Sequence, residues 1–256
     1  MKRQSGDENN PMTTQTILYG IAPVQQCLLN RNRQCHELLI KAETRSPRIK
    51  ELISLASKRG IRIKEISAQG IADVSKTKLH QGVVLVCSEL NLLSLEEFVE
   101  QMQSNEKVLL IALDQVEDPQ NVGAIIRSAA FLGAGGLITL KTHSAPLSAA
   151  VSKASAGALE YFPIIEVANL SEAIQWLKRN GFFVIGSTLD RDSIEFNQIP
   201  LTDHMVLVMG NEGQGLRKLT QKRCDQLVHI PGNFQTESLN VSAAAAILIQ
   251  YLVNAE

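Results

Sequence analysis

The sequence predicts an α/β protein in two parts: a small amino-terminal α/β unit, and a larger carboxy-terminal unit built on a mostly parallel sheet. Along most of the chain, apolar runs with strand character alternate with helical patterns of about ten to fifteen residues, which is typical of parallel sheets covered on both faces. The chain has 256 residues, 45% of them apolar and 20% charged, so each part can bury its own core. An acidic helical stretch, residues 94–107, separates the two parts.

The first unit is expected over residues 16–90. Its clearest element is the helix 46–60, because Ser46 is a capping residue type, Pro47 suits a first turn and Gly60 follows the end. The predicted helices of this unit are 20–31, 46–60 and 70–77, and the predicted strands are 36–42, 61–66 and 82–90. Residues 1–15 lack an apolar signal core and are expected to be a disordered extension. Residues 91–106 are expected to be a linker.

The second unit, residues 107–256, repeats the alternation of strands and helices. Its predicted strands are 108–116, 136–140, 162–167, 182–189, 204–210 and 226–230, and its predicted helices are 121–133, 147–161, 169–181, 215–223 and 238–255. Ligands of parallel sheets bind outside the carboxyl ends of the strands. The loops that follow Leu113, Ser187, Met209 and Ile230 are therefore the candidate site.

Charge is unevenly distributed between the two units. Residues 16–90 contain 12 Lys and Arg against 6 Asp and Glu, whereas residues 91–256 contain 11 against 18. This asymmetry indicates a basic amino-terminal module that contacts a polyanion such as RNA or DNA. The alternative is that the basic residues only solubilise two helices.

The four cysteines are scattered, without a Cys-x-x-Cys pair or a histidine at zinc spacing. This argues against a metal site and fits a reducing, cytoplasmic setting. No run of about twenty apolar residues exists, so no membrane contact is expected.

Three loops contain polar residues that call for an explanation. In the first loop and its helix, Asn121, Gly123 and Arg127 stand within the otherwise apolar pattern VGAIIRSAAFL. An unpaired guanidinium in a core is costly. Arg127 therefore forms either a structural ion pair, or a two-point grip on a phosphate or carboxylate at the mouth of a cleft.

The second loop, VMGNEGQGL, looks like a nucleotide-binding turn, but its glycines follow G-x-x-G-x-G and no Gly-Lys-Ser/Thr is present. Gly210 would let a ligand approach the backbone, and Gly215 would start the next helix. Glu212 disfavours a phosphate. As an acceptor, it could bind an amine or hydroxyl, or pair with Arg127.

The third loop leads into an alanine-rich helix and clusters Ser238, Asn240 and Ser242 at its start. Capping alone would explain Ser238. Asn240 is harder to explain in this way, because Asn is a poor helix former in a first turn.

Taken together, these segments resemble the three motifs of the SpoU (TrmH-type) ribose 2′-O-methyltransferases. The matching motifs are Asn-x-x-x-x-x-Arg from Asn121, Gly-Asn-Glu-Gly-x-Gly-Leu from Gly210, and Ile-Pro…Ser-Leu-Asn-Val-Ser from Ile230. They occur in the family's order and at strand ends. The resemblance covers about residues 107–254, including the stretch KASAGALEYFPIIEVANL from Lys153. The amino-terminal stretches ILYGIAPVQQCLL and HQGVVLV resemble the ribosomal-protein-like RNA-binding domain of the subgroup that modifies a guanosine of bacterial 23S ribosomal RNA.

The resemblance implies a carboxy-terminal SPOUT domain with a trefoil knot, which binds S-adenosylmethionine and forms a homodimer. It implies RNA as the substrate, with ribosomal RNA first and transfer RNA second. The implied cofactor contacts are Gly210, Ile230, Leu239 and Thr188. Arg127 is implied to activate the 2′-hydroxyl, and the residues implied to hold Arg127 and the ribose are Asn121, Glu212, Ser238 and Asn240.

The third motif departs from the family pattern at Gly232 and Phe234, and Glu237 adds a charge beside Ser238. These departures concern the choice of target nucleotide. The alternatives to this activity are an RNA-binding assembly factor without turnover and a nicotinamide-dependent enzyme. The order of the glycines argues against the second.

Overall fold

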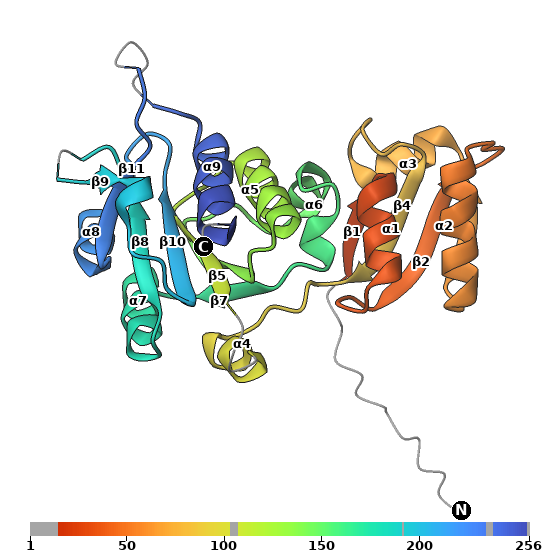
Figure 1. The fold of residues 1–256 in the computed structure, drawn as a ribbon. Coiled ribbons are helices and arrows are strands. Elements are labelled where there is room, and N and C mark those ends of the chain that lie inside the picture. The colour runs from red at the N-terminus through yellow and green to blue at the C-terminus, as the bar shows by residue number, and fades with distance from the viewer. Residues whose placement is uncertain (1–14, 103–106, 191, 234–237, 255–256) are drawn as a thin grey trace, which may run out of the picture.

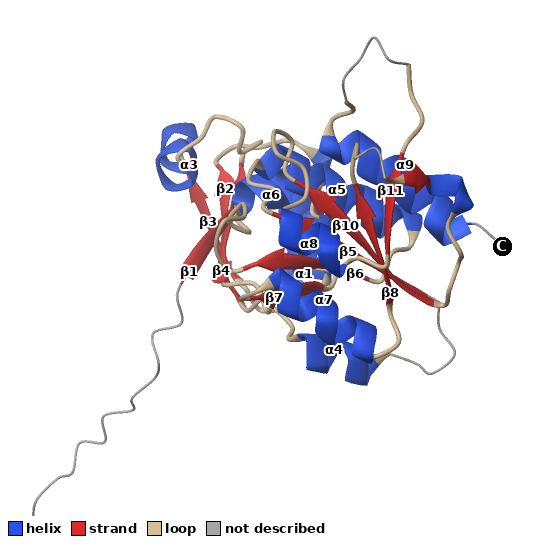
Figure 2. Cartoon of the chain, turned by 90° about the vertical axis from the view of Figure 1, so that its left-hand side faces the viewer, coloured by secondary structure: helices blue, strands red, loops and turns tan. Residues whose placement is uncertain are grey.

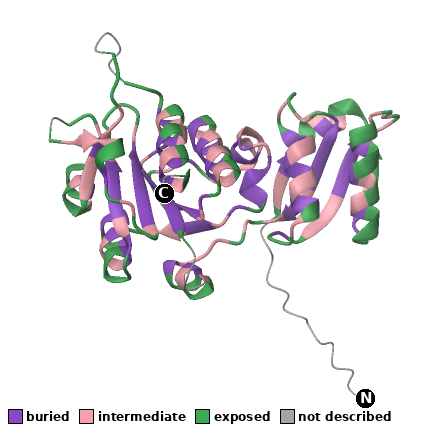
Figure 3. Ribbon diagram, in the orientation of Figure 1, coloured by how far each residue is buried: buried purple, intermediate pink, exposed green. Residues whose placement is uncertain are grey.

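The computed structural model describes residues 15–102, 107–190, 192–233 and 238–254 of the chain. Two sheets lie side by side, each with its own helices (Figures 1 and 2). The central strands of each sheet are largely buried, and the helices expose their outer faces (Figure 3). Most of the extension expected over residues 1–15 lies outside the described residues.

The amino-terminal sheet has four strands in the order β1-β4-β2-β3, with bounds β1 Gln15–Tyr19, β2 Cys35–Lys41, β3 Arg62–Ile66 and β4 Val83–Ser88. The β2–β3 pair is parallel and the other two pairs are antiparallel. Strand β1 was not predicted, and its first residue, Gln15, falls inside the predicted extension. The strand is short, and its pairing with β4 along one edge of the sheet leaves little periodicity to detect.

Three helices cover this sheet, with bounds α1 Ile21–Leu29, α2 Pro47–Lys58 and α3 Ala68–Ser75. Helices α1 and α2 pack on one core and α3 on a smaller one across the sheet. Ser46 occupies the N-cap position of α2 without a side-chain cap bond. In α3, by contrast, Ser67 accepts a hydrogen bond from the Gly70 amide.

The carboxy-terminal sheet has seven strands in the order β7-β6-β5-β10-β8-β11-β9, and all of its pairs are parallel. The bounds are β5 Val108–Asp114, β6 Gly136–Leu140, β7 Ile164–Val167, β8 Phe183–Ser187, β9 Ile194–Glu195, β10 His204–Gly210 and β11 Gln226–His229. The short strand β9 was not predicted. Strand β10 inserts between β5 and β8, so spatial order departs from chain order in the middle of the sheet.

Helices cover both faces of this sheet, as the alternating pattern predicted. The bounds are α4 Leu95–Gln101, α5 Pro119–Leu132, α6 Ala149–Ala154, α7 Leu170–Arg179, α8 Lys218–Arg223 and α9 Val241–Asn254, with 3-10 turns η1 Ala158–Glu160 and η2 Phe196–Gln198. Helices α5, α6 and α9 contribute to one core, and α4 and α7 contribute to the core on the opposite face.

The helix predicted over residues 147–161 is wrong in one respect, because it breaks after α6. Ala156 and Gly157 adopt left-handed backbone angles, with φ of 53° and 88°. A Cβ on Gly157 would lie 2.8 Å from the Ala22 carbonyl oxygen of α1, so the break lets the two units approach closely.

The predicted linker is attached to the carboxy-terminal sheet over its described part. Leu93 forms a parallel bridge with Ile165 at the β7 edge, and its amide donates to the Ile164 carbonyl at 2.9 Å. Leu95 and Phe98 are buried in the same core. A capping box formed by Ser94 and Glu97 starts α4.

Candidate functional site

The predicted convergence of three distant loops is present in the structure. Strands β5 and β10 are neighbours, and Gly210 lies opposite Asp114 at their carboxyl ends. The loops that follow these two strands therefore leave the sheet side by side. The start of α9 reaches the same place, because Asn240 contacts Asn121 and Glu212.

One hydrogen-bonded cluster joins the three motifs. The side-chain amide of Asn121 donates to the Glu212 carboxylate, and also to Asp118 at 3.0 Å. The side-chain NH₂ group of Asn240 donates to the side-chain oxygen of Asn121 at 3.0 Å and lies 3.5 Å from a Glu212 carboxylate oxygen. Asn121 is buried. The cluster therefore fixes α5, the β10 loop and α9 relative to one another.

Asn240 also caps helix α9. Its side-chain oxygen accepts from the Ser242 amide at 2.9 Å and from the Ser242 hydroxyl at 2.6 Å. The capping role suggested for Ser238 is therefore wrong, because α9 begins at Val241 and Ser238 is exposed before it. Asn240 suits both tasks, since its oxygen caps the helix while its NH₂ group remains free to donate to the cluster.

The β10 loop is a tight turn closed by its own backbone. Asn211 and Gly215 exchange hydrogen bonds of 3.1 and 2.8 Å. A Cβ on Gly210 would lie 2.3 Å from the Gly215 carbonyl carbon and 2.5 Å from the Leu216 nitrogen. Gly210 is thus required by the turn itself. Gly215 has a φ of 67° and closes the turn instead of starting a helix, so that prediction is wrong; α8 begins at Lys218.

Asn211 and Asp114 were missed by the sequence analysis, although both organise this loop. The Asn211 side chain accepts from the Gly213 amide at 2.9 Å and donates to the Gln115 carbonyl at 2.9 Å. Asp114 is fully buried and accepts from the Arg217 amide at 3.0 Å and from Arg217 Nε at 2.6 Å. The only available signal for Asp114 was a carboxylate at the end of an apolar strand.

Asp118 caps helix α5. It accepts from the Gln120 amide at 3.0 Å and from the Asn121 side chain. Both hydrogen bonds favour the ionised carboxylate and hold the pKa of Asp118 below its ordinary value, the Gln120 amide having the larger effect. The site thus presents carboxylate oxygens, which suits amines, hydroxyls and cations.

Arg127 lies on α5 and is exposed. Among the described residues, no side chain forms an ion pair or hydrogen bond with Arg127. The structural ion pair that was one interpretation of Arg127 is therefore not formed within these residues. Glu212, its suggested partner, pairs with Asn121 instead. The guanidinium is therefore available to an anionic ligand.

The four predicted cofactor residues lie at the ends of adjacent strands or at the start of α9. Thr188 follows β8, and its amide donates to the Val228 carbonyl at 2.9 Å. Ile230 follows β11 and packs partly against the core, whereas Leu239 before α9 is half exposed. Gly210 ends β10. Among the departures from the motif, Gly232 is exposed, while Phe234 and Glu237 lie outside the described residues.

No group of three or more His, Cys, Asp or Glu in the described residues is arranged to hold a metal ion. The helices of that same portion are too short or too polar to cross a bilayer.

The cysteines are less scattered than their spacing suggests, because the Cys27 and Cys35 sulfurs lie 3.8 Å apart and Cys35 faces Cys87 across β2 and β4. Burial raises the pKa of Cys224 to about 12.

Comparison with known proteins agrees with this arrangement. The SpoU rRNA methylase family model matches residues 108–250, and the model for RNA 2′-O ribose methyltransferase substrate binding matches residues 17–93. The 23S rRNA (guanosine-2′-O-)-methyltransferase RlmB of Neisseria meningitidis is 36% identical over 239 residues, covering 93% of this chain and 94% of the relative. The protein of the same name from Coxiella burnetii is 34% identical over 233 residues, covering 91% and 92%.

A solved structure gives the same result for the fold. The crystal structure of the AdoMet-bound rRNA methyltransferase from Sinorhizobium meliloti matches with a TM-score of 0.77 at 24% identity, covering 93% of this chain and 86% of that chain. The predicted fold class, a small α/β unit followed by an α/β domain on a mostly parallel sheet, is confirmed.

Proposed function

The chain belongs to the SpoU family of rRNA methylases, and we propose that it transfers the methyl group of S-adenosylmethionine to a ribose 2′-hydroxyl of RNA, at a guanosine of 23S ribosomal RNA. The observation that carries the proposal is the cluster of Asn121, Glu212 and Asn240, because one residue from each motif meets there. The RlmB relatives carry this activity in their names and align with nearly the whole chain.

Residues 16–90 are proposed as the RNA-binding domain, residues 91–106 as the linker and residues 107–256 as the methyltransferase domain. The excess of basic residues in the first segment and its match to the substrate-binding family support this division. RNA is the proposed partner, and the cytoplasm is the proposed location.

The residues of the site fit S-adenosylmethionine better than a phosphorylated nucleotide. The turn after Gly210 offers backbone groups, Ile230 and Leu239 offer apolar surface, and Glu212 offers an anionic acceptor. A carboxylate repels phosphate but suits the amino group and the positive sulfonium of this cofactor. Thr188, at the end of β8, is a fourth proposed contact. When bound, the cofactor supplies an electrophilic methyl group.

Arg127 is the proposed catalytic residue. A guanidinium is effectively always charged, so it does not act as a simple base. We infer that it orients the 2′-oxygen and an adjacent phosphate, and stabilises the negative charge that develops on that oxygen. Its exposure and its lack of an ion-pair partner among the described residues leave it available for this role.

Asn121, Glu212 and Asn240 are proposed to hold the first turn of α5, and through it Arg127, beside the methyl donor; Ser238 is proposed to contact the ribose. Orientation of this kind is worth up to about 7–11 kcal/mol. The proton of the 2′-hydroxyl passes to water as the new carbon–oxygen bond forms and the methyl–sulfur bond breaks.

A homodimer through the methyltransferase domain is part of the proposal. Phe131 on α5 is 87% exposed and Ile247 on α9 is 41% exposed, and an apolar ring in water favours burial by a partner. Arg127 is exposed on the same helix as Phe131. A second copy of the chain against α5 would complete one active site with residues of both subunits.

Substituting Arg127 tests the catalytic role. Arg127→Ala is expected to abolish methyl transfer to ribosomal RNA lacking the modification, while the dissociation constant of S-adenosylmethionine stays within about twofold. Arg179→Ala, which removes an exposed arginine at the end of α7, is the control and should retain activity. Near-normal turnover of Arg127→Ala would remove Arg127 from the mechanism.

Mapping ribose methylation in cells that lack the protein tests the substrate. One guanosine mark should disappear from 23S ribosomal RNA. A change confined to transfer RNA would favour the transfer-RNA alternative. If S-adenosylmethionine binds and no RNA is methylated, the role of a non-catalytic assembly factor is favoured.

A further inference from the structure

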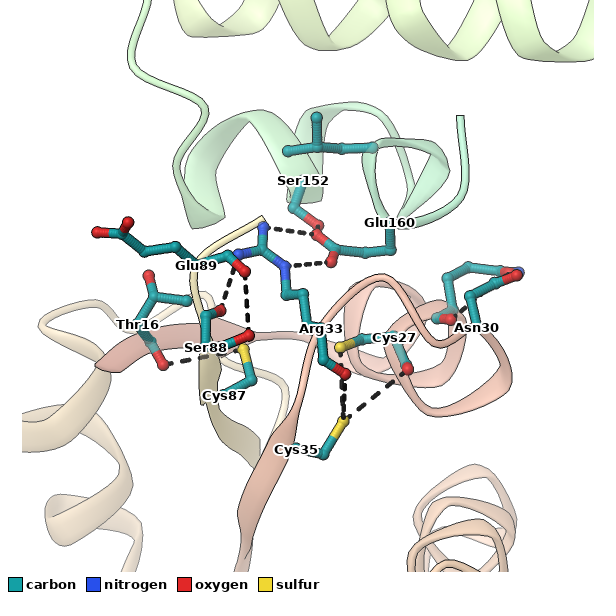
Figure 4. Close-up of polar contacts among 12 residues, drawn as sticks. Thr16, Cys27, Asn30, Arg33, Cys35, Cys87, Ser88, Glu89, Ser152 and Glu160 are labelled. Carbon is teal, nitrogen blue, oxygen red and sulfur yellow. Dashed lines mark hydrogen bonds and ion pairs between the residues drawn. The ribbon is translucent and has the colours of Figure 1, made fainter. Parts of the chain in front are cut away.

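A buried ion pair joins the two units of the chain. Arg33, in the loop after α1, contacts Glu160 in η1 with an Nε–Oε2 distance of 2.6 Å (Figure 4). A second contact, Nη2 to Oε1, measures 3.4 Å. The two side chains are only 3% and 0% exposed, although the residues are 127 positions apart in the sequence.

Neighbouring groups form further hydrogen bonds with both members of this pair. Arg33 Nη1 donates to the Ser88 carbonyl at 3.1 Å, and the Ser152 hydroxyl donates to Glu160 Oε1 at 2.7 Å. Desolvation alone would lower the pKa of Arg33, but the Glu160 carboxylate outweighs it and the pKa is raised. Two-point contacts of this type also fix orientation, because the guanidinium is a rigid fork.

Further contacts between the units surround the ion pair. Gly157, with its left-handed backbone, brings η1 against the Ala22 carbonyl of α1. Lys153 of α6 donates to the Leu79 carbonyl at 2.6 Å and lies 5.8 Å from the centre of the Tyr19 ring. The segment α6–η1 is thus the surface of the methyltransferase domain on which the first unit rests.

The opposite side of the same segment supports the proposed active site. Helix α6 packs on α5 so closely that a Cβ on Gly123 would lie 2.4 Å from the Ala154 Cβ. Gly123 lies between Asn121 and Arg127 on α5. One short segment therefore touches the RNA-binding unit on one side and the helix of the catalytic arginine on the other.

We propose that Arg33 and Glu160 form an interdomain latch, which holds the RNA-binding domain in one orientation so that bound RNA presents its target ribose to Arg127. The proposal rests on the proposed function. Arg33 and Glu160 are positioning residues, since both side chains are buried at the contact between the two units and act through the domain orientation. When the two domains are held in one orientation, one RNA molecule can bind both without first ordering them. When the domains are joined only by a flexible linker, the effective concentration of one domain's RNA-binding surface near the other is lower.

The test compares wild type with Arg33→Met, Glu160→Gln and the double variant, all in the full-length chain. Each single change leaves a buried charge without its partner, which favours opening of the interface to water. We expect the KM for RNA to rise at least about tenfold, with kcat and S-adenosylmethionine affinity within about threefold. The double variant leaves neither charge unpaired and should recover most of the loss. The control Arg179→Met removes one exposed positive charge at the end of α7, outside the proposed RNA-binding domain, and should leave the KM unchanged.

Small-angle X-ray scattering supplies a readout independent of activity. The single variants should show a broader distance distribution than wild type and Arg179→Met, and the double variant should return toward wild type. The proposed latch would be refuted if both single variants had the same scattering and the same KM for RNA as the wild-type protein. If Arg33→Met does not fold, Glu160→Gln decides the question, because it preserves the shape of the side chain. If the wild-type protein methylates no RNA, the proposed function fails and scattering alone decides the latch.

Discussion

Replacing Gly210 by alanine tests whether the β10 loop forms the cofactor site. The new Cβ would lie 2.3 Å from the Gly215 carbonyl carbon and 2.6 Å from its oxygen. Both contacts involve backbone, so no side chain can rotate away, and the turn must shift by about 1 Å to restore van der Waals spacing. Overpacking of this kind costs about 1–3 kcal/mol.

If the turn must return to its native shape to hold S-adenosylmethionine, the same free energy weakens binding by about five- to 150-fold. Isothermal titration of the cofactor measures this change. Gly213→Ala is a matched control in the same loop, because its Cβ would meet only the Asn211 side-chain oxygen, at an ordinary 3.6 Å. Equal affinities for the two variants would refute the assignment of this turn to the cofactor.

Three further predictions concern the surrounding network. Asn240→Asp keeps the oxygen that caps α9 but removes the donor to Asn121 and places a second carboxylate beside Glu212, so methyl transfer should fall at least about tenfold and the melting temperature should also fall. Asp118 has a lowered pKa in the folded protein, so its contribution to stability is present above the ordinary value of 3.8 and is lost as pH falls through the lower folded value. Urea unfolding should therefore show a smaller stability loss below pH 3.8 in Asp118→Asn than in wild type. Arg217→Ala removes the partner of a fully buried carboxylate and should destabilise the fold by about 1–3 kcal/mol, whereas Lys218→Ala, an exposed neighbour, should stay within about 0.5 kcal/mol; equal melting temperatures for these two variants would contradict this.

The parts of the site that depend on strand direction could be predicted from sequence. Because the carboxyl ends of parallel strands share one edge of a sheet, the polar residues after β5 and β10 were expected to meet there, and Asn121 and Glu212 do so. The helices and most strands followed from apolar periodicity.

Features that depend on backbone contacts or on distant pairing could not be predicted. Asn211 acts on the amides and carbonyls of its own loop, and such contacts leave no pattern in the sequence. Gly157 approaches the backbone of Ala22 in α1, which lies 135 residues earlier in the chain, and no local sequence pattern reports this approach. For the same reason Arg33 and Glu160 gave no sign of their pairing, since each is an ordinary charged residue in its own segment.

The late insertion of β10 has a consequence for biosynthesis. While the ribosome is still translating the segment before His204, strands β5 and β8 each lack the neighbour that later separates them. The unpaired backbone groups at their edges can form hydrogen bonds with strands of other chains. The nascent chain therefore needs a chaperone or rapid completion to avoid aggregation. Contacts between strands so far apart in the chain also slow folding.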